Sequence, residues 1–522
     1  MGDEYSLAWS ALTRYGYHGP NVTGGAMVVL VLVLVVILVL LVVCVVRAAA
    51  MKPTLPAGSP IDAGGYHAGD AEIERFRTLL RIPTVSRDDP AQLDREPFDR
   101  WVPTLQRLYP RTFQTLELTR IDEYGILMRW PGRDSSLAPV VMMAHHDVVP
   151  TDGQDWTYPP FAAEVHDGQI WARGTLDNKL CFCGCMEAFE HLLAEGYVPP
   201  RDIWFFSSCC EETSGPTADN AVVWLREHNV HPCMVLDEGG AVATGVPLGV
   251  TAPMAMVGVS EKGHVDVTVT AHGAGGHASA PSKNDATRLL ARATERICAN
   301  PGKPQVADAV TAMLQELAAR GSFAYRIIFA NMWLFRPLVG RILAAGAETG
   351  PMVRSTYALT QLAGSPARNV LPPEAAANLN VRVAPFEDVN AALARARAQA
   401  AEECRESGVA TDAVSVDIAE NSLVNEPSPF SPHDDAQFDY IRRCVAGIYP
   451  EAGVCPYVQT SCSDSRSFTK ICDHVYRFAA FIYTPTARTL IHSANERIPV
   501  DDYKRGVEFY VAFVRGLDQL KA

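Results

Sequence analysis

Two adjacent histidines and an aspartate end a strongly apolar run at residues 141–150, VMMAHHDVVP. Residues 140–144 are typical of a strand buried on both faces, as found in parallel sheets. Side chains alternate along a strand, so His145 and Asp147 should point to one side and His146 to the other. Such a histidine can bind a metal ion through one ring nitrogen while a carboxylate fixes the second nitrogen. A single histidine at a strand end is more often satisfied by the backbone, so a metal site requires further ligands.

Four other places put acidic or histidine side chains at expected strand ends or in adjoining loops. They are Asp177 in WARGTLDNK, Glu211 and Glu212 in SSCCEET, Asp237 and Glu238 in VLDEGG, and His492 in TLIHSANERIP. Any one of them could cap a helix or lie in a solvated turn. Paired acids after an apolar strand are costly unless a positive group lies between them. Together with His145, they predict a centre of two metal ions with the nitrogen and oxygen ligands typical of zinc.

The segments around these residues predict an α/β fold. From about residue 71 to 255, helical patterns alternate with apolar strands, which is typical of a mainly parallel sheet. From about 260 the pattern changes to alternating strands with few helices, which favours a small antiparallel α+β domain. The first pattern returns at about 425. We therefore expect one domain of residues 71–259 and 425–522, with residues 260–424 inserted as a second domain.

The amino terminus predicts a membrane anchor. Residues 26–46, AMVVLVLVLVVILVLLVVCVV, contain no charge, proline or glycine. At about 1.5 Å per residue this helix would cross the roughly 30 Å of a bilayer core. A polar tail, residues 1–25, precedes it, and a linker rich in Pro, Gly and Ala, residues 47–70, follows.

A second apolar stretch, residues 322–346, lies inside the predicted insertion. It could pack in a core, cover the site or lie on a membrane, and core packing is favoured. Arg326, Arg336 and Arg341 argue against a second membrane span.

The composition excludes some classes of protein. The 522 residues are too many for one ordinary domain, and 48% hydrophobic with 20% charged residues is a globular composition. The net charge of -14, with no basic cluster, argues against a nucleic-acid partner. The thirteen cysteines follow no disulfide or zinc-ribbon spacing, so we expect most of them to be free and buried.

The motifs MAHHDVVP, WARGTLDNK, the Glu-Glu pair, LDEGG, GGHASAP and IHSANERI together closely resemble those of the zinc aminoacylase and carboxypeptidase family. This family includes aminoacylase-1, acetylornithine deacetylase and succinyl-diaminopimelate desuccinylase. The resemblance runs from about residue 70 to 522 in the family's order. It is closest to the branch of carboxypeptidase S and the N-fatty-acyl-amino-acid synthase/hydrolases, which also has one amino-terminal hydrophobic segment.

The resemblance implies which residues hold two zinc ions. The implied ligands are His145 on one ion, His492 and Glu212 on the other, Asp177 bridging both, and either Asp237 or Glu238 as the fifth. Asp147 would orient the ring of His145. Glu211 would be the general base, taking a proton from a metal-bridging water and passing it to the leaving amine.

The resemblance also implies roles for the inserted domain and for the substrate side of the site. The insertion would be a lid and a homodimer contact, and His277 would stabilise the tetrahedral oxyanion, often across the dimer interface. Asn369 and Arg382 stand at substrate-side positions. Arg466 could bind a substrate carboxylate in bidentate fashion or form an internal salt bridge. Ala172 and Asn178 replace the usual glycine and aspartate of relatives, which bears on substrate preference more than on activity.

These observations predict a membrane-anchored dinuclear zinc hydrolase that cleaves an amide bond next to a free carboxylate. The substrate would be an N-acyl amino acid or the carboxyl end of a peptide. A dipeptidase is an alternative, and so is a non-catalytic membrane receptor or scaffold, although the chain retains the base and every ligand. The resemblance places the catalytic body on the lumenal or extracellular side. Arg47 and Lys52 after the span favour the cytosolic side instead.

Overall fold

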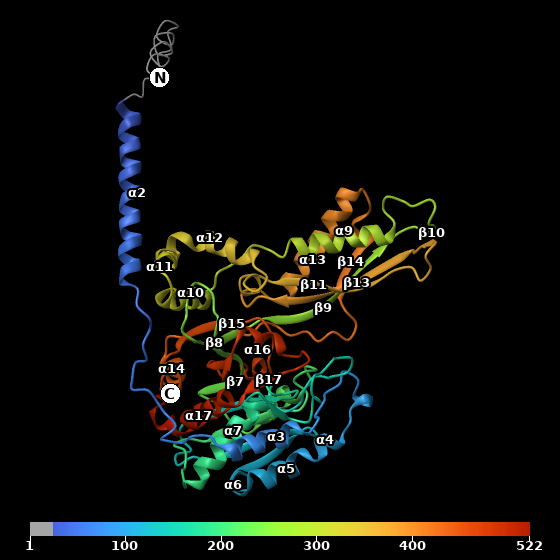
Figure 1. Cartoon of the computed structure of the whole chain (residues 1–522). Helices are drawn as coiled ribbons and strands as arrows, with labels where there is room; N and C mark the ends of the chain where they lie inside the picture. The colour runs from blue at the N-terminus through green and yellow to red at the C-terminus, as the bar shows by residue number, and fades with distance from the viewer. Residues whose placement is uncertain (1–23, 522) are drawn as a thin grey trace.

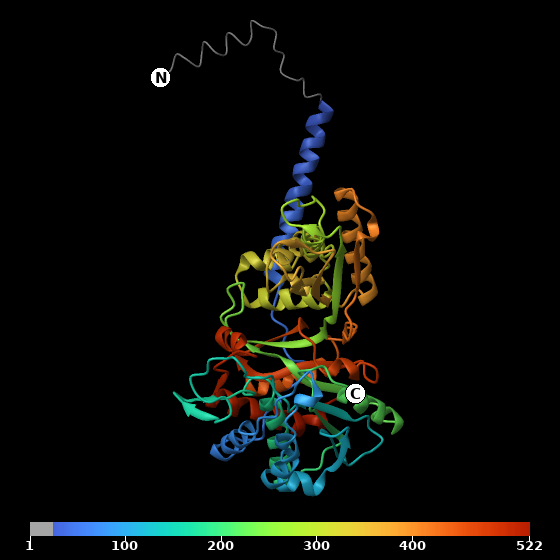
Figure 2. The ribbon, with the colours of Figure 1, turned by 90° about the vertical axis from the view of Figure 1, so that its right-hand side faces the viewer.

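A computed structural model describes residues 24–521. The predicted tail lies outside these residues except for its last two, which begin helix α2 (Gly24–Ala50). Two sheets, one above the other in Figure 1, form the body of the molecule. Both views show α2 projecting from that body as a single straight helix (Figure 2).

The larger domain is built on an eight-stranded sheet with the order β1-β2-β6-β3-β7-β16-β8-β15. Its strands are β1 (Glu117–Ile121), β2 (Gly125–Trp130), β3 (Val140–His145), β6 (Ile203–Ser208), β7 (Met234–Ala243), β8 (Met254–Glu261), β15 (Gly453–Gln459) and β16 (Val475–Tyr483). The central strands β6, β3, β7 and β16 run parallel. This confirms the predicted α/β class, with antiparallel strands β1 and β2 added at one edge.

Helices cover both faces of this sheet, which explains why β3 and β6 are buried along their whole length. One face packs mainly on α3 (Asp70–Leu80), α5 (Trp101–Leu108), α7 (Lys179–Ala194), α14 (Ala436–Ile448) and α17 (Val500–Arg515). The other face packs on α8 (Thr217–Glu227) and α15 (Ser465–Phe468). The remaining helices of this domain are α4 (Glu96–Asp99), α6 (Pro110–Thr115) and α16 (Pro485–Leu490). A small sheet of β4 (Glu164–His166), β5 (Gln169–Trp171) and β17 (Arg497–Pro499) lies beside them.

The smaller domain is an antiparallel sheet with the order β11-β13-β9-β14. Its strands are β9 (Gly263–His272), β11 (Thr356–Ala363), β13 (Glu374–Val383) and β14 (Val414–Ile418). Burial alternates along β9 and β13, because one face packs on α9 (Ala286–Ala299) and α13 (Val389–Ser407) and forms a separate core. A short two-stranded antiparallel sheet of β10 (Gly276–His277) and β12 (Val370–Leu371) extends from this domain.

Three helices inside the predicted insertion pack with the larger domain. They are α10 (Asp308–Arg320), α11 (Phe323–Phe329) and α12 (Met332–Ala345). Their buried side chains, among them Val310, Leu314 and Val339, belong to the core of the larger domain. The assignment of all of 260–424 to one inserted domain therefore stays a prediction, since part of this stretch shares the larger core.

The chain between α2 and α3 lies along the larger domain. Ile61 and Ala63 are buried, and the Ile61 amide donates to the Arg443 carbonyl at 3.0 Å. The Ala57 amide donates to the Asp439 carboxylate at 2.9 Å. This linker is thus docked over much of its length, although its Pro, Gly and Ala content is typical of a free connection.

Candidate metal centre

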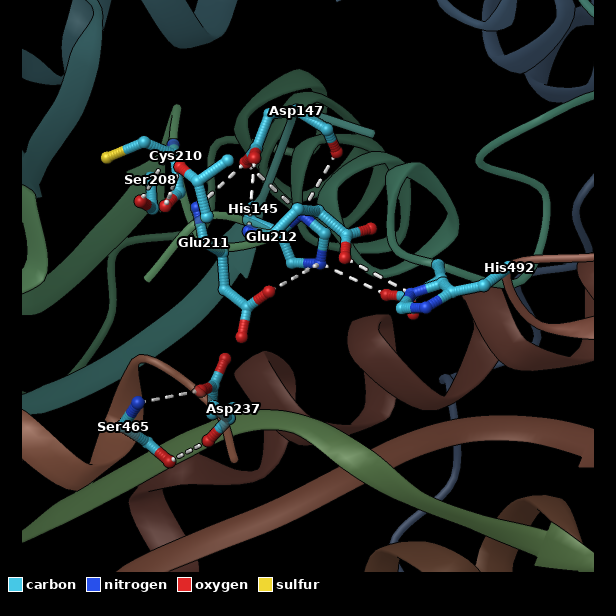
Figure 3. A network of polar contacts seen from close by, with 12 residues as sticks. His145, Asp147, Ser208, Cys210, Glu211, Glu212, Asp237, Ser465 and His492 are labelled. Atoms are coloured by element: carbon cyan, nitrogen blue, oxygen red, sulfur yellow. Dashed lines mark hydrogen bonds and ion pairs between the residues drawn. The ribbon is translucent and has the colours of Figure 1, made fainter. Parts of the chain in front are cut away.

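The carboxyl ends of β3 and β6 bring the first site residues together. His145 pairs in register with Ser208, the last residue of β6. The Asp147 carboxylate accepts hydrogen bonds from the backbone amides of Glu211 and Glu212, each at 3.2 Å. Asp147 therefore fixes the turn that aims both glutamates at the end of β3. Figure 3 shows His145, Asp147, Glu211, Glu212 and His492 gathered there.

Asp177 lies between two histidines that are far apart in the sequence. Its Oδ1 is 3.1 Å from His145 Nε2, and its Oδ2 is 3.0 Å from His492 Nε2. His492 Nε2 is also 3.1 Å from Glu212 Oε2. The ligand atoms of His145, Asp177 and Glu212 lie within 4.8 Å of one another, close enough to share a metal ion. Asp177 thus offers one carboxylate oxygen to each of two imidazoles, and carboxylate and imidazole side chains are groups that can bind a metal ion.

Asp147 also contacts the ring of His145 on the side away from Asp177. His145 Nδ1 is 3.0 Å from the Asp147 carbonyl oxygen and 3.4 Å from its carboxylate. Both oxygens can accept a proton from Nδ1, and Nε2 then points to Asp177 as the ring nitrogen available to a metal ion.

Asp237 and Glu238, at the middle of β7, point to different surroundings. The Asp237 carboxylate accepts from the Ser465 amide at 3.1 Å, and Figure 3 shows it facing that residue. Burial, followed by the charges of Asp177 and Asp237, raises the pKa of Glu238 well above its ordinary value. The charge of Asp177 thus acts on Glu238, whereas the Asp237 carboxylate is engaged by the Ser465 amide.

Glu211 lies beside the cluster with a side chain that is 13% exposed, and it makes no short contact with the other acids or histidines of the described chain. Its Oε2 is 3.9 Å from His145 Nε2. Burial raises the pKa of Glu211 well above its ordinary value, and the carboxylates of Asp464, Glu212 and Glu238 add to that shift. A carboxyl group with a raised pKa next to a metal cluster is suited to accept a proton and return it.

The donor set fits a metal centre. Hydrogen bonds to Asp177 and Glu212 raise the pKa of His492 to about 10, so His492 carries a proton between two carboxylates. Burial, followed by the charge of Asp177, raises the pKa of Glu212 to about 7. Glu212 Oε1 is buried and has no hydrogen-bond partner among the described residues. Divalent cations would take the place of these protons and satisfy the free oxygen, and two imidazoles with several carboxylates are ligands that zinc accepts.

A buried ion pair that the sequence patterns did not single out holds two of these residues in place. Arg173 Nη1 donates to Glu496 at 2.5 Å, and Arg173 Nη2 donates to the His492 carbonyl at 3.2 Å. Glu496 in turn accepts from the backbone amides of Leu176 at 2.6 Å and Asp177 at 3.3 Å. The pair therefore ties the Asp177 loop to the His492 loop. Arg173 lies within the motif WARGTLDNK and Glu496 within IHSANERI. Their opposite charges were the only feature of the sequence that could have indicated this ion pair.

His146 lies on the opposite side of β3. It is fully buried, its ring stacks on Trp101, and its Nδ1 is 2.8 Å from the Ser207 hydroxyl. Burial lowers the pKa of His146 to about 3, so it stays neutral within the core.

Two of the predicted substrate residues meet where the two domains join. Arg382 Nη1 is 3.5 Å from Cys462 Sγ, and Arg466 Nη1 donates to the Ser463 carbonyl at 3.2 Å. Arg466 is largely buried, and the charges of Glu261 and Asp464 help to raise its pKa although burial opposes this. Of the two alternatives for Arg466, an internal salt bridge has no carboxylate partner within residues 24–521, and binding of a substrate carboxylate stays a prediction.

His277 and Asn369 lie apart from the cluster. His277 is on the exposed strand β10, where its Nδ1 is 2.7 Å from the Ser279 hydroxyl. The Ala278 amide donates to the Asn369 carbonyl at 3.1 Å, which places Asn369 beside β10 at the start of β12. Figure 1 shows β10 at the outer end of the smaller domain, away from β7 in the larger domain. One chain therefore does not bring these two residues to its own cluster.

Comparisons with known proteins place these features in context. Residues 141–516 match the model of peptidase family M20/M25/M40. The chain is 31% identical over 453 residues to the N-fatty-acyl-amino acid synthase/hydrolase PM20D1 of Xenopus tropicalis, covering 85% of this chain and 86% of that protein. It is 29% identical to the probable carboxypeptidase S-like 2 of Dictyostelium discoideum, covering 91% of each. Among solved structures, human carnosine dipeptidase 1 has a similar fold, with a TM-score of 0.60 at 16% identity over 86% of this chain and 96% of that one.

Proposed function

The chain belongs to peptidase family M20/M25/M40, and from this premise we propose that it is a membrane-anchored hydrolase with two zinc ions that cleaves an amide bond next to a free carboxylate. Membership of the family makes it a metallopeptidase or a related amidohydrolase, and it confirms the resemblance found in the motifs. The observation that carries the proposal is the convergence of His145, Asp177, Glu212 and His492 beside Glu211.

We assign the zinc ligands from the contacts around Asp177. His145 would hold one ion and His492 with Glu212 the other, while Asp177 would bridge them. Glu238 is the preferred fifth ligand, because the Asp237 carboxylate is engaged by the Ser465 amide. Bound at these positions, two zinc ions would supply Lewis acidity and lower the pKa of a water molecule that attacks the substrate.

Glu211 would move the proton. Its carboxylate lies beside the cluster, and burial together with neighbouring acids gives it the affinity to take a proton from the attacking water. The same carboxyl would then give the proton to the leaving amine. Asp147 positions Glu211 through the backbone amide, so the base and the metal ligand Glu212 keep a fixed relation.

The free carboxylate of the substrate would bind at the domain junction. Arg466 has donors without an acidic partner in the described chain, and Arg382 approaches the same loop through Cys462. A planar guanidinium can hold a carboxylate with two parallel hydrogen bonds. This arrangement supports substrates that end in a carboxylate close to the scissile amide, such as N-acyl amino acids and peptides.

His277 would act in a homodimer. Its distance from its own cluster supports a role for His277 of the partner subunit in stabilising the oxyanion. Mixing Glu211→Gln and His277→Ala subunits tests this idea. Dimers that contain one of each would recover activity if His277 acts across the interface, because one site then has both groups. No recovery would be expected if His277 served its own chain.

A substrate panel tests the function itself. The zinc-loaded full chain, purified in detergent micelles, is assayed against N-acyl amino acids of increasing acyl length, dipeptides, and the same N-acyl amino acids with the carboxylate amidated. We expect hydrolysis of the free acids and little of the amides. Glu211→Gln is the matched control, and we expect it to lose activity by about 10²- to 10⁴-fold while keeping its zinc. A zinc-loaded chain that hydrolyses nothing in the panel would favour the receptor or scaffold alternative, and cleavage of dipeptides alone would favour a dipeptidase.

A further inference from the structure

Helices α11 and α12 carry an unusual amount of exposed apolar surface. On α12, the exposed fractions are 40% for Leu334, 52% for Leu338 and 63% for Ile342. These three residues follow one another at four-residue intervals, so they form one stripe on the helix. Trp333 is 57% exposed beside them, and Phe323 and Tyr325 of α11 are exposed as well. We call the six side chains together the α11–α12 surface.

The stripe points away from the catalytic sheet. The opposite side of α12 holds the buried residues Met332, Val339 and Ala344, and Arg336 pairs with Asp308 of α10 at 2.5 Å. In Figure 1, α10 lies between α12 and the strands β8 and β15. The exposed stripe therefore faces the side of the molecule from which α2 projects.

The base of α2 is fastened to the same helices. Cys44 and Ala48, on one stripe of α2, are buried where α11 packs against it. The Asn331 side chain donates to the Cys44 carbonyl at 3.1 Å, and Arg47 Nε donates to the Ala330 carbonyl at 3.0 Å. The hinge between α11 and α12 is thus fixed to the last turns of α2, and the apolar surfaces of the three helices are continuous.

We propose that the α11–α12 surface lies in the headgroup and upper acyl region of the bilayer that α2 crosses, so that the body has a second, monotopic membrane contact. The inference rests on the proposed membrane anchoring by α2. The partner is a phospholipid surface. A helix with one apolar face and tryptophan or tyrosine at its border is the form that binds in the plane of such a surface.

The charges beside the stripe fit phospholipid headgroups. Arg341 is exposed next to Leu338 on α12, and Arg47 lies at the base of α2. Long basic side chains at this depth can reach phosphate groups while their methylene stems stay in the apolar layer. Helices α11 and α12 meet at a bend of 104°, so the two helices run in different directions along the proposed membrane surface. A contact with a second copy of the chain would not account for the continuity with α2.

Tryptophan quenching by brominated lipids tests the proposal on the full chain. The protein is reconstituted into vesicles of phosphatidylcholine with a minor share of phosphatidylglycerol, with bromine on the acyl chains near the glycerol. Trp333 should report from within the bilayer, because the segment Met27–Ala50 of α2 contains no tryptophan. We expect Trp333→Phe to abolish most of the bromine-dependent quenching. Trp224→Phe is the matched control, since Trp224 packs on Trp204 and His228 at α8 and should leave the quenching unchanged.

A second variant addresses the stripe itself. Changing Leu334, Leu338 and Ile342 together to serine alters exposed side chains, and the quenching of Trp333 should fall by roughly half or more as α12 leaves the lipid. Flotation of each variant with the vesicles reports separately on α2. Chain that floats while the wild type and Trp333→Phe are quenched equally would overturn the membrane contact and leave the anchor standing. Chain that does not float would overturn both.

Discussion

Glu238 and Asp237 are neighbours with different predicted roles. Glu238→Gln removes the proposed fifth ligand, so the zinc affinity should fall by more than the roughly 10- to 100-fold typical of partners outside the ligand set. Asp237→Asn keeps an acceptor for the Ser465 amide and should stay within that range. Metal content after dialysis against graded chelator measures both. A larger loss for Asp237→Asn would reverse the assignment of the fifth ligand.

Zinc binding at this site should release protons. The pKa of His492 is about 10 and that of Glu212 about 7 in the metal-free chain, so both hold protons at low pH that zinc must displace. Apparent affinity should therefore weaken as the pH falls, by about tenfold per unit below 10 for His492 and by a further tenfold per unit below 7 for Glu212. Competition with a chelator at pH 6, 7 and 8 gives the slope. His492→Ala should lower the slope by about one proton, and an unchanged slope would contradict the assignment.

The residues of the cluster could be read from the sequence because chemistry limits which side chains serve. Each of these residues alone has other uses, but a histidine and paired acids after several apolar strands, in the order of a known family's motifs, made His145 and the Glu211–Glu212 pair stand out. The choice between Asp237 and Glu238 could not be made, since it depends on an amide of Ser465 more than two hundred positions away. Arg173 and Glu496 were missed for the same reason, because their pairing across the fold has no local pattern.

The two adjacent histidines at the end of strand β3 have different expected roles, one in metal binding and one in the core. His145→Ala should cost zinc and activity, because it removes a ring that contacts Asp177. His146→Ala should keep zinc but destabilise the fold by about 2–4 kcal/mol, because it opens a cavity beside Trp101. Thermal unfolding and zinc content measured on both variants separate the two effects. Loss of zinc in His146→Ala with the fold intact would mean that the faces of the strand are the other way round.

At the level of elements, the periodicity of apolar residues predicted the types of the strands, but it did not predict on which domain helices α10 to α12 pack. The alternation along β9 and the buried run of β3 gave the correct strand types. Helices α10 to α12 were placed in the insertion because they lie between its strands in sequence, yet their side chains join the core of the larger domain. The order of elements along the sequence does not show whether a helix packs in the core of the larger domain or in that of the smaller domain.

The side of the membrane on which the body would lie, given the proposed anchoring by α2, is a property of the whole molecule. The family resemblance favours the lumenal or outer side, whereas Arg47 and Lys52 favour the cytosol. In sealed vesicles from cells, protease added to the cytosolic side should leave residues 51–521 intact and digest them only after detergent. Digestion without detergent would place the body in the cytosol. A protease-resistant soluble marker inside the vesicles controls for leakage.

The docked linker, residues 51–69, limits how far the body of the molecule can move relative to helix α2. A flexible chain of the length of residues 51–69 would let the body wander by roughly 25 Å above the bilayer. The hydrogen bonds from Ala57 and Ile61 to α14 instead hold this linker in a fixed position on the larger domain. With α2 in a bilayer, as proposed, the candidate metal cluster would then be held at one height above the lipid and in one orientation. An enzyme mounted in this way meets only those molecules that pass through a single thin layer of solution beside the membrane.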